Sequence, residues 1–141
     1  MDEGTGSLSG LSEQECWRLL EQRTVGRVAL AADGEAPMVL PVNYIVHEDT
    51  VLFRTSGGGV LGTAAAWGRP VAFQVDNVDE VEHAGWSVLL RGDLREAVPS
   101  QEAALAERVT PWAAGERHSV GVVVPHTITG RWLSQPRPDA G

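Results

Sequence analysis

The chain of 141 residues carries 11 basic against 19 acidic side chains, a formal net charge of -8 at pH 7, and 43% of its residues are hydrophobic. This length and composition indicate one folded domain and exclude a disordered chain. The acidic balance excludes nucleic acid and anionic membranes as expected partners, because their phosphates would be repelled. A single cysteine excludes an internal disulfide, and with no secretory signal in view we expect a cytoplasmic protein.

Residues 1–10 are rich in glycine, serine and acidic side chains, and we expect them to form a flexible tail. A helix is predicted over residues 13–22, because Ser12 and Glu15 have the spacing of a capping box and the apolar residues that follow share one face. Cys16 lies on that face, where we expect an inert core thiol.

Six runs rich in β-branched residues follow and predict strands at residues 25–32, 38–46, 51–55, 71–76, 86–98 and 120–125. The first three are joined by Asp33-Gly34 and by residues 47–49. Because these links are too short for a parallel crossover, we expect an antiparallel meander. Between the third and fourth strands, the alanine-rich residues 61–67 predict a short helix that ends at Gly68.

Alternation in the later strands indicates which side chains face the core. Val71, Phe73 and Val75 are predicted to point inward. Gly92, inside the long run 86–98, predicts a bulge or sharp bend that lets a small sheet curl into a barrel. A third helix is expected to start with Pro99 and Ser100 and to run through about Val109, with Ser100 as its candidate N-cap, and the proline-rich residues 134–141 are expected to form a second tail.

The segment Arg54-Thr55-Ser56-Gly57-Gly58-Gly59 is a candidate phosphate site. Consecutive glycines let backbone N–H groups approach a ligand, the helix that follows presents its positive end, and Arg54 adds a fork of donors. The alternative is a flexible turn. Neither the Gly-x-Gly-x-x-Gly spacing nor a Gly-Lys-Ser/Thr ending is present, which excludes a Rossmann or P-loop assignment.

Pro41 lies within a predicted strand, where it removes one hydrogen bond of the ladder. One interpretation is a bulge, or a place where a planar ligand lies alongside in place of a neighbouring strand. The other is an ordinary edge strand with Asn43 and Tyr44 at the surface. In the run 85–92, Trp86 and Ser87 point to opposite faces, so one can pack in the barrel while the other meets a ligand or a partner subunit.

The remaining aromatic and titratable residues suggest no further site. The tryptophans are expected mainly as core or interface anchors; they are Trp17, Trp67, Trp86, Trp112 and Trp132. The four histidines lack metal-ligand spacing, and we expect no metal site. No Ser-His-Asp set or carboxylate pair can be defined, so no catalytic residue is assigned.

The order of these segments resembles the pyridoxamine 5′-phosphate oxidase-like family of FMN-binding split barrels. The resemblance covers residues 11–133. It is carried by Val25-Gly26-Arg27-Val28, Leu40-Pro41-Val42-Asn43-Tyr44, Phe53-Arg54-Thr55, residues 71–76 and 85–92, Pro111-Trp112 and Thr129-Gly130-Arg131. Within the family, the chain is similar to the small nitroimidazole-resistance-type branch rather than to the vitamin B6 oxidase, whose additional C-terminal substrate-binding segment is not found.

The resemblance implies a mostly β fold, a six-stranded antiparallel split barrel with two or three short helices. It also implies a homodimer with an FMN site at each end of its interface, and hydride transfer between reduced flavin and a small oxidised substrate. It assigns the isoalloxazine ring to the backbone of Leu40, Pro41, Val42 and Asn43, the ribityl phosphate to Arg54, Thr55 and Ser56, the ring edge to Ser87, and a cover from the second subunit to Trp112. Gly58, Gly59 and Leu61 are also expected to bind the cofactor.

One position departs from the family pattern. Members usually carry a phosphate-binding lysine near the start of the bridging helix, and Val60 stands at that place. A charge-assisted hydrogen bond contributes about 1.5–3 kcal/mol, so its loss alone would weaken binding about ten- to a hundredfold. Arg54 and the glycine amides could offset this loss. The alternatives are a deazaflavin coenzyme, or a non-catalytic protein that binds a flavin, a deazaflavin or a tetrapyrrole.

Overall fold

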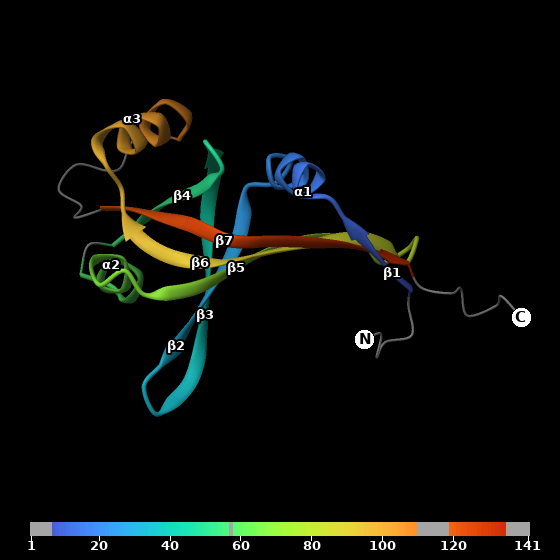
Figure 1. Cartoon of the computed structure of the whole chain (residues 1–141), viewed down its shortest axis with the longest axis horizontal. Coiled ribbons are helices and arrows are strands. Elements are labelled where there is room, and N and C mark those ends of the chain that lie inside the picture. The colour runs from blue at the N-terminus through green and yellow to red at the C-terminus, as the bar shows by residue number, and fades with distance from the viewer. Residues whose placement is uncertain (1–6, 57, 110–118, 135–141) are drawn as a thin grey trace, which may run out of the picture.

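The computed structural model describes residues 7–56, 58–109 and 119–134 (Figure 1). In this part of the chain the elements follow one another as β1 (Ser7–Leu11), α1 (Glu13–Leu20), β2 (Val25–Ala32), β3 (Glu35–His47), β4 (Thr50–Thr55), α2 (Val60–Ala66), β5 (Pro70–Asp79), β6 (Ala84–Glu96), α3 (Pro99–Arg108) and β7 (Ser119–Ser134). The expected tail residues 1–6 and 135–141 lie outside the described ranges. The described part contains no helix long and apolar enough to cross a membrane.

The strands form one antiparallel sheet in the order β1-β7-β4-β3-β2-β5-β6, and β6 also pairs with β7, which closes the ring. This confirms the mostly β barrel and the β2-β3-β4 meander. The described residues contain seven strands rather than the expected six, because Ser7 to Leu11 pair with the far half of β7. The expected N-terminal tail was therefore too long. The backbone pairing with β7 compensates for the weak strand pattern of these residues.

β7 is much longer than residues 120–125, over which a strand was expected. Its register with β6 shifts at one point: Arg91 lies opposite Thr127 and Gly92 opposite Pro125, so His126 is the extra residue of a bulge. The bulge accommodates Pro125 within the strand. A Cβ on Gly92 would collide with the carbonyl oxygen of Val124, which explains the glycine and confirms the bend predicted there.

The three helices begin and end through local capping. In α1 the Ser12 hydroxyl accepts the Glu15 N–H at 3.2 Å and the Glu15 carboxylate accepts the Ser12 N–H at 3.1 Å, so the capping box is confirmed. α3 begins at Pro99, within the expected start of the third helix. Its N-cap is Val98, not Ser100, because Pro99 already has the φ of a first helical residue.

The core lies inside the ring and is closed by α1 and α2. Val71, Phe73 and Val75 are buried as predicted, and the rings of Tyr44 and Phe73 meet edge to face at 5.1 Å. Cys16 is fully buried, and burial raises the pKa of its thiol, with smaller contributions from nearby carboxylates. A smaller apolar cluster lies beneath α3; its buried members are Ile45, Leu52, Leu105 and Val122.

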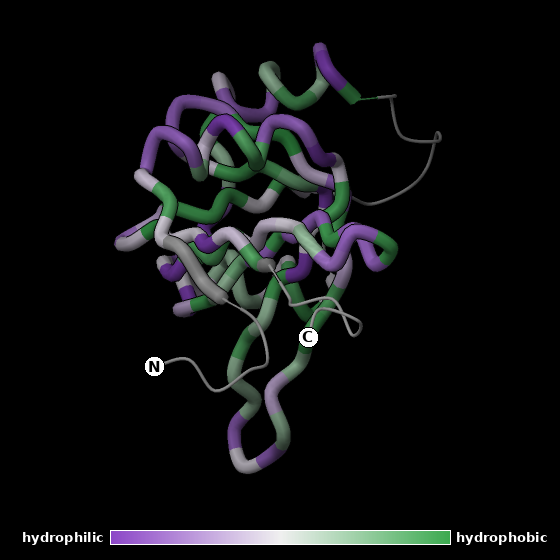
Figure 2. Tube along the Cα trace, turned by 90° about the vertical axis from the view of Figure 1, so that its right-hand side faces the viewer, coloured by the Kyte–Doolittle hydropathy of each residue, from purple (hydrophilic) through white to green (hydrophobic). Residues whose placement is uncertain are grey.

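The β2-β3 hairpin extends away from the body of the molecule (Figures 1 and 2). Gly34 at its turn has a φ of +70°, as expected for the Asp33-Gly34 link. β2 pairs with β5 only from Arg27 to Ala29, and β3 pairs with β4 only from Tyr44 to His47. Within the described residues, the outer part of the hairpin therefore has no third strand beside it.

Candidate functional site

The glycine loop, represented here by Gly58 and Gly59, and the β2-β3 hairpin border a pocket of about 380 Å³, which we call the glycine pocket. Its walls are the end of β2, one residue of β3 and one face of α2. The lining residues are Leu30, Ala31, Ala32, Met38, Gly58, Gly59, Val60, Thr63, Ala64, Trp67 and Arg69. Ligand pockets in proteins have volumes of about 300–1,000 Å³. The glycine pocket is therefore large enough for part of a small cofactor.

The residues from Glu35 to Asn43 of β3 have β2 on one side and an open edge on the other. The Tyr44 N–H points toward β2, because it donates to the carbonyl oxygen of Thr24 at 2.9 Å. Since successive N–H groups of a strand point to opposite edges, the missing N–H of Pro41 falls on the open edge. The proline therefore removes no bond to β2, and the backbone groups of Val39 and Asn43 face the open edge.

The side chains of this stretch alternate between core and surface. Leu40 and Val42 pack against the core, and their backbone N–H groups face β2, as that of Tyr44 does, while Pro41 and Asn43 are exposed. Tyr44 is buried and its hydroxyl donates to the carbonyl oxygen of Leu20 at 2.5 Å. The surface position considered for Tyr44 is thus wrong. Burial raises the pKa of this phenol to about 12.

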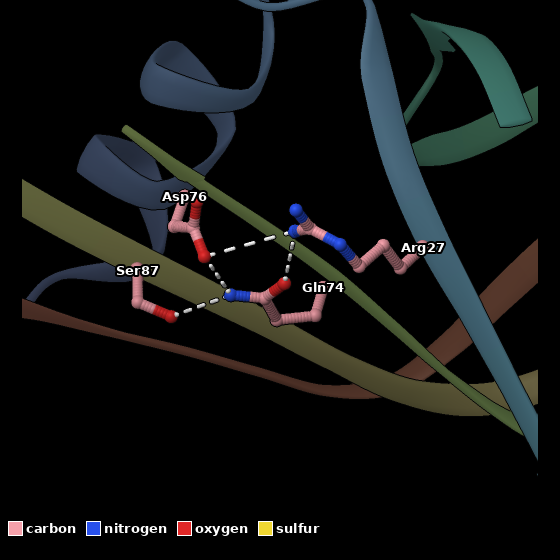
Figure 3. Close-up of polar contacts among 4 residues, drawn as sticks. All are labelled: Arg27, Gln74, Asp76 and Ser87. Atoms are coloured by element: carbon pink, nitrogen blue, oxygen red, sulfur yellow. Dashed lines mark hydrogen bonds and ion pairs between the residues drawn. The ribbon is translucent and has the colours of Figure 1, made fainter. Parts of the chain in front are cut away.

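A polar cluster of Arg27, Gln74, Asp76 and Ser87 lies on the outer face of β2, β5 and β6 (Figure 3). The Gln74 amide nitrogen donates to the Asp76 carboxylate at 2.9 Å and to the Ser87 hydroxyl at 3.1 Å. The Gln74 amide oxygen accepts from the Arg27 guanidinium at 3.2 Å, and Arg27 also lies 3.7 Å from Asp76.

Ser87 points away from the buried Trp86, as predicted. Its oxygen accepts the Gln74 amide, which leaves the Ser87 hydroxyl hydrogen to be donated to a group beside the sheet. Gln74, Asp76 and Arg27 were not selected as site residues from the sequence. Their alternation along the strands was available as a signal, but only the register of three strands brings them together.

Arg54 lies apart from the glycines. It lines a separate pocket of about 500 Å³ beneath α3, and its guanidinium donates to the carbonyl oxygen of Val109 at 3.4 Å. Thr55 is buried, with its hydroxyl 2.7 Å from that of Ser119. Ser56 is exposed and its carbonyl oxygen accepts the Gly59 N–H, whereas the Leu61 side chain packs against the core. Gly57 and Trp112 lie outside the described residues.

Of the residues that line the glycine pocket, only Gly58 and Gly59 were selected from the sequence as cofactor-binding, and Met38, Trp67 and Arg69 are among those that were missed. Gly68, with a φ of +63°, ends α2 in a reversal in which the Gly68 and Arg69 N–H groups donate to Ala65 and Ala64. This turn carries Arg69 back beside the pocket. Gly68 indicated in the sequence that the chain reverses after the helix. The sequence did not indicate in which direction the chain continues.

The comparisons with known proteins agree with this fold. The family model described as pyridoxamine 5′-phosphate oxidase matches residues 12–132. An uncharacterized protein of Mycobacterium tuberculosis, Rv0080, is 30% identical over 125 residues, which are 85% of this chain and 82% of that protein. An FAD-binding protein of Mycobacterium smegmatis is 35% identical, with a TM-score of 0.78 over 91% of this chain and 100% of that chain.

The fold also occurs in a proposed 5-nitroimidazole antibiotic resistance protein of Bacteroides thetaiotaomicron. The two structures superpose with a TM-score of 0.66 over 90% of this chain and 89% of that chain, and the sequences are 14% identical. At this identity the likeness concerns the fold alone. It agrees with the resemblance to the small nitroimidazole-resistance-type proteins.

Proposed function

Because the chain belongs to the pyridoxamine 5′-phosphate oxidase family, we propose that it binds a flavin and transfers a hydride between the reduced flavin and a small oxidised substrate. The observation that carries the proposal is the meeting of the open edge of β3 with the glycine pocket. Met38 belongs to both. A flat ring can lie along the open edge while the phosphate-bearing chain enters the pocket.

The residues present fit a flavin. The Val39 backbone groups on the open edge offer a donor and an acceptor to the polar edge of the ring. The Ser87 hydroxyl, oriented by Gln74, offers one more donor beside the sheet. The FAD-binding relative of Mycobacterium smegmatis supports a flavin as the ligand. FMN is the part that both common flavin cofactors share, and it is this part that the open edge and the Gly58 amide would hold, because the Gly59 N–H is donated to Ser56.

A bound flavin supplies the hydride chemistry, and the residues of the chain position it. The open edge of β3 would orient the ring. Ser87 lies on β6, with β2 and β5 between it and β3, so its hydroxyl would reach that ring from the second subunit of a dimer. Solvent would protonate the reduced product, and the named residues would act by binding and orientation.

We propose further that the chain is a homodimer with a cofactor site at each side of the interface. Val25, Val39 and Leu89 are exposed on the outer face of β2, β3 and β6, the same face that carries the polar cluster. A second subunit on this face would bury these apolar side chains. Light scattering should then give twice the chain mass of 15.1 kDa, and a monomer at micromolar concentration would contradict the proposal.

Val60 favours a second candidate function, a flavin, deazaflavin or tetrapyrrole binder without turnover. Val60 lines the glycine pocket at the place where the family usually carries its lysine. The cation that the pocket does have is Arg69, at its far end. A phosphate held there would still meet a charge, which supports binding in both candidate functions.

The absorption spectrum of the purified protein tests the binding step, followed by titration of the apo form with FMN and FAD while tryptophan fluorescence is recorded. We expect saturable quenching at one flavin per subunit. Reduction of the bound flavin by a nicotinamide donor and reoxidation by a substrate then separate the two candidates. Binding without either step would favour the non-catalytic protein, and no binding of any flavin or deazaflavin would contradict both.

A further inference from the structure

Arg131 lies on β7 directly opposite Ser87 of β6, and on its other side it lies opposite Gly10 of β1. Directly opposite side chains of an antiparallel sheet share a face, with their Cβ atoms about 5 Å apart. Arg131 therefore belongs to the outer face that carries Ser87 and the rest of the polar cluster (Figure 3). The alternation along β7 agrees with this, because a Cβ on the preceding Gly130 would meet the buried Cys16 thiol.

The side chain of Arg131 is open to a ligand or a partner subunit. Arg131 is exposed, the Ser87 side chain is short, and a Cβ on Gly10 would meet nothing within 4 Å. Among the described residues no carboxylate lies within ion-pair distance of Arg131, whereas Arg27 on the same face lies 3.7 Å from the Asp76 carboxylate. A guanidinium is always charged. Arg131 thus places a full positive charge beside Ser87, in a chain whose net charge is -8.

Hydride transfer changes the charge of a flavin ring. The hydride of a nicotinamide donor consists of one proton and two electrons, so the ring gains one negative charge when it accepts the hydride. A cation beside the polar edge of the ring stabilises that charge and favours the reduced flavin over the oxidised one. Arg131 is suited to this role, because its cross-strand neighbour Ser87 is the donor assigned to the same edge.

We propose that Arg131 raises the reduction potential of the bound flavin by placing a positive charge beside the ring edge that Ser87 contacts. This inference rests on the proposed flavin function, and both residues act from the same subunit. Two unit charges about 7 Å apart change an equilibrium constant about threefold in water and about fiftyfold at an effective dielectric constant of about 20. We expect about a tenfold preference for the reduced flavin, which is about 30 mV for a two-electron couple.

The test measures the midpoint potential of bound FMN against a reference dye in the wild-type protein, Arg131→Gln and Arg131→Lys, together with the dissociation constant of oxidised FMN. Arg91→Gln is the matched control. Arg91 is also exposed and lies on the same face of β6, four residues and about 13 Å from Ser87. We expect Arg131→Gln to lower the potential by about 30 mV, Arg131→Lys to restore most of this loss, and Arg91→Gln to match the wild type.

Other outcomes would overturn the inference in distinguishable ways. An unchanged potential in Arg131→Gln would remove the charge from the ring edge and leave the flavin function intact. An equal fall in Arg91→Gln would show that only the net charge of the chain matters. Equal weakening of oxidised and reduced FMN binding, or no FMN binding by Arg131→Gln, would make Arg131 a general contact of the cofactor. A wild-type protein that binds no FMN would overturn the proposed function as well.

Discussion

The position of the phosphate can be tested by restoring the missing cation with Val60→Lys. Val60 lines the glycine pocket and is 44% exposed, so a lysine can enter without displacing the core. A charge-assisted hydrogen bond contributes about 1.5–3 kcal/mol when it is well shielded. At a site that is nearly half exposed, solvent screening reduces the gain to about 0.7–1.5 kcal/mol, which is about a three- to tenfold gain in affinity.

The assay is a fluorescence titration of the apo protein with FMN and with riboflavin, which has no phosphate, at low and high ionic strength. Val60→Lys should tighten FMN binding about three- to tenfold, leave riboflavin binding unchanged, and lose most of its advantage in high salt. Val78→Lys is the control. Val78 is 47% exposed and lines a different pocket. A lysine there adds the same positive charge to the chain, whose net charge is -8.

Two results would refute this reasoning. An equal gain for FMN and riboflavin would show that the lysine acts away from the phosphate. An equal gain in Val60→Lys and Val78→Lys would show that only the overall charge matters. In either case, the phosphate would not lie beside Val60, and the pocket beneath α3 that Arg54 lines would become the place to examine.

Four further predictions concern the ring edge, the second phosphate candidate, the fold and pH. Ser87→Ala should weaken flavin binding about two- to tenfold, measured by the same titration, because a donor to the ring is lost; unchanged affinity would remove Ser87 from the site. Arg54→Ala should weaken FMN binding at least tenfold if its guanidinium reaches the phosphate, whereas unchanged calorimetric affinity would leave the phosphate to the glycine pocket. Gly92→Ala should lower the free energy of unfolding, measured in urea, by about 1–3 kcal/mol, because its Cβ would meet the backbone of Val124. Gly10→Ala is the control and should change this free energy little, since nothing lies within 4 Å of its Cβ. Similar losses in the two variants would contradict the contact. Burial raises the pKa of Tyr44 to about 12, above the value near 10 of an unfolded tyrosine, so the unfolded state releases its proton first. The free energy of unfolding should therefore fall by up to about 3 kcal/mol as the pH rises from 10 to 12. Denaturation of Tyr44→Phe should lack this slope, and an equal slope in both proteins would refute the assignment.

Local sequence patterns were sufficient to predict much of the fold. The alternation at Val71, Phe73 and Val75 specifies the buried face of β5, because a strand places successive side chains on opposite faces. Ser12 and Glu15 define the start of α1 through bonds within four residues. Such patterns depend on neighbours in the chain, so they can be recognised without the tertiary structure.

The same reasoning was less successful where distant segments decide the outcome. β1 is a strand because it pairs with the second half of β7, which β6 also pairs, and the alternation in Ser7 to Leu11 is too weak to predict this. The N-cap of α3 is Val98 and not the expected Ser100, because Pro99 is well suited to be the first helical residue. Neither result follows from the propensity of one segment alone.

The candidate site divides in the same way. The sequence alone was enough to select three segments as candidates. These are Leu40 to Asn43, with a proline inside a strand, the glycines before α2, and Ser87, which points away from Trp86. Only the tertiary structure decided that the glycines share a pocket with Trp67 and Arg69, while Arg54 lines another. The physical reason is that a pocket is formed by side chains from separate elements. Its membership depends on how α2 packs beside the β2-β3 hairpin, and no periodicity within either element encodes that packing.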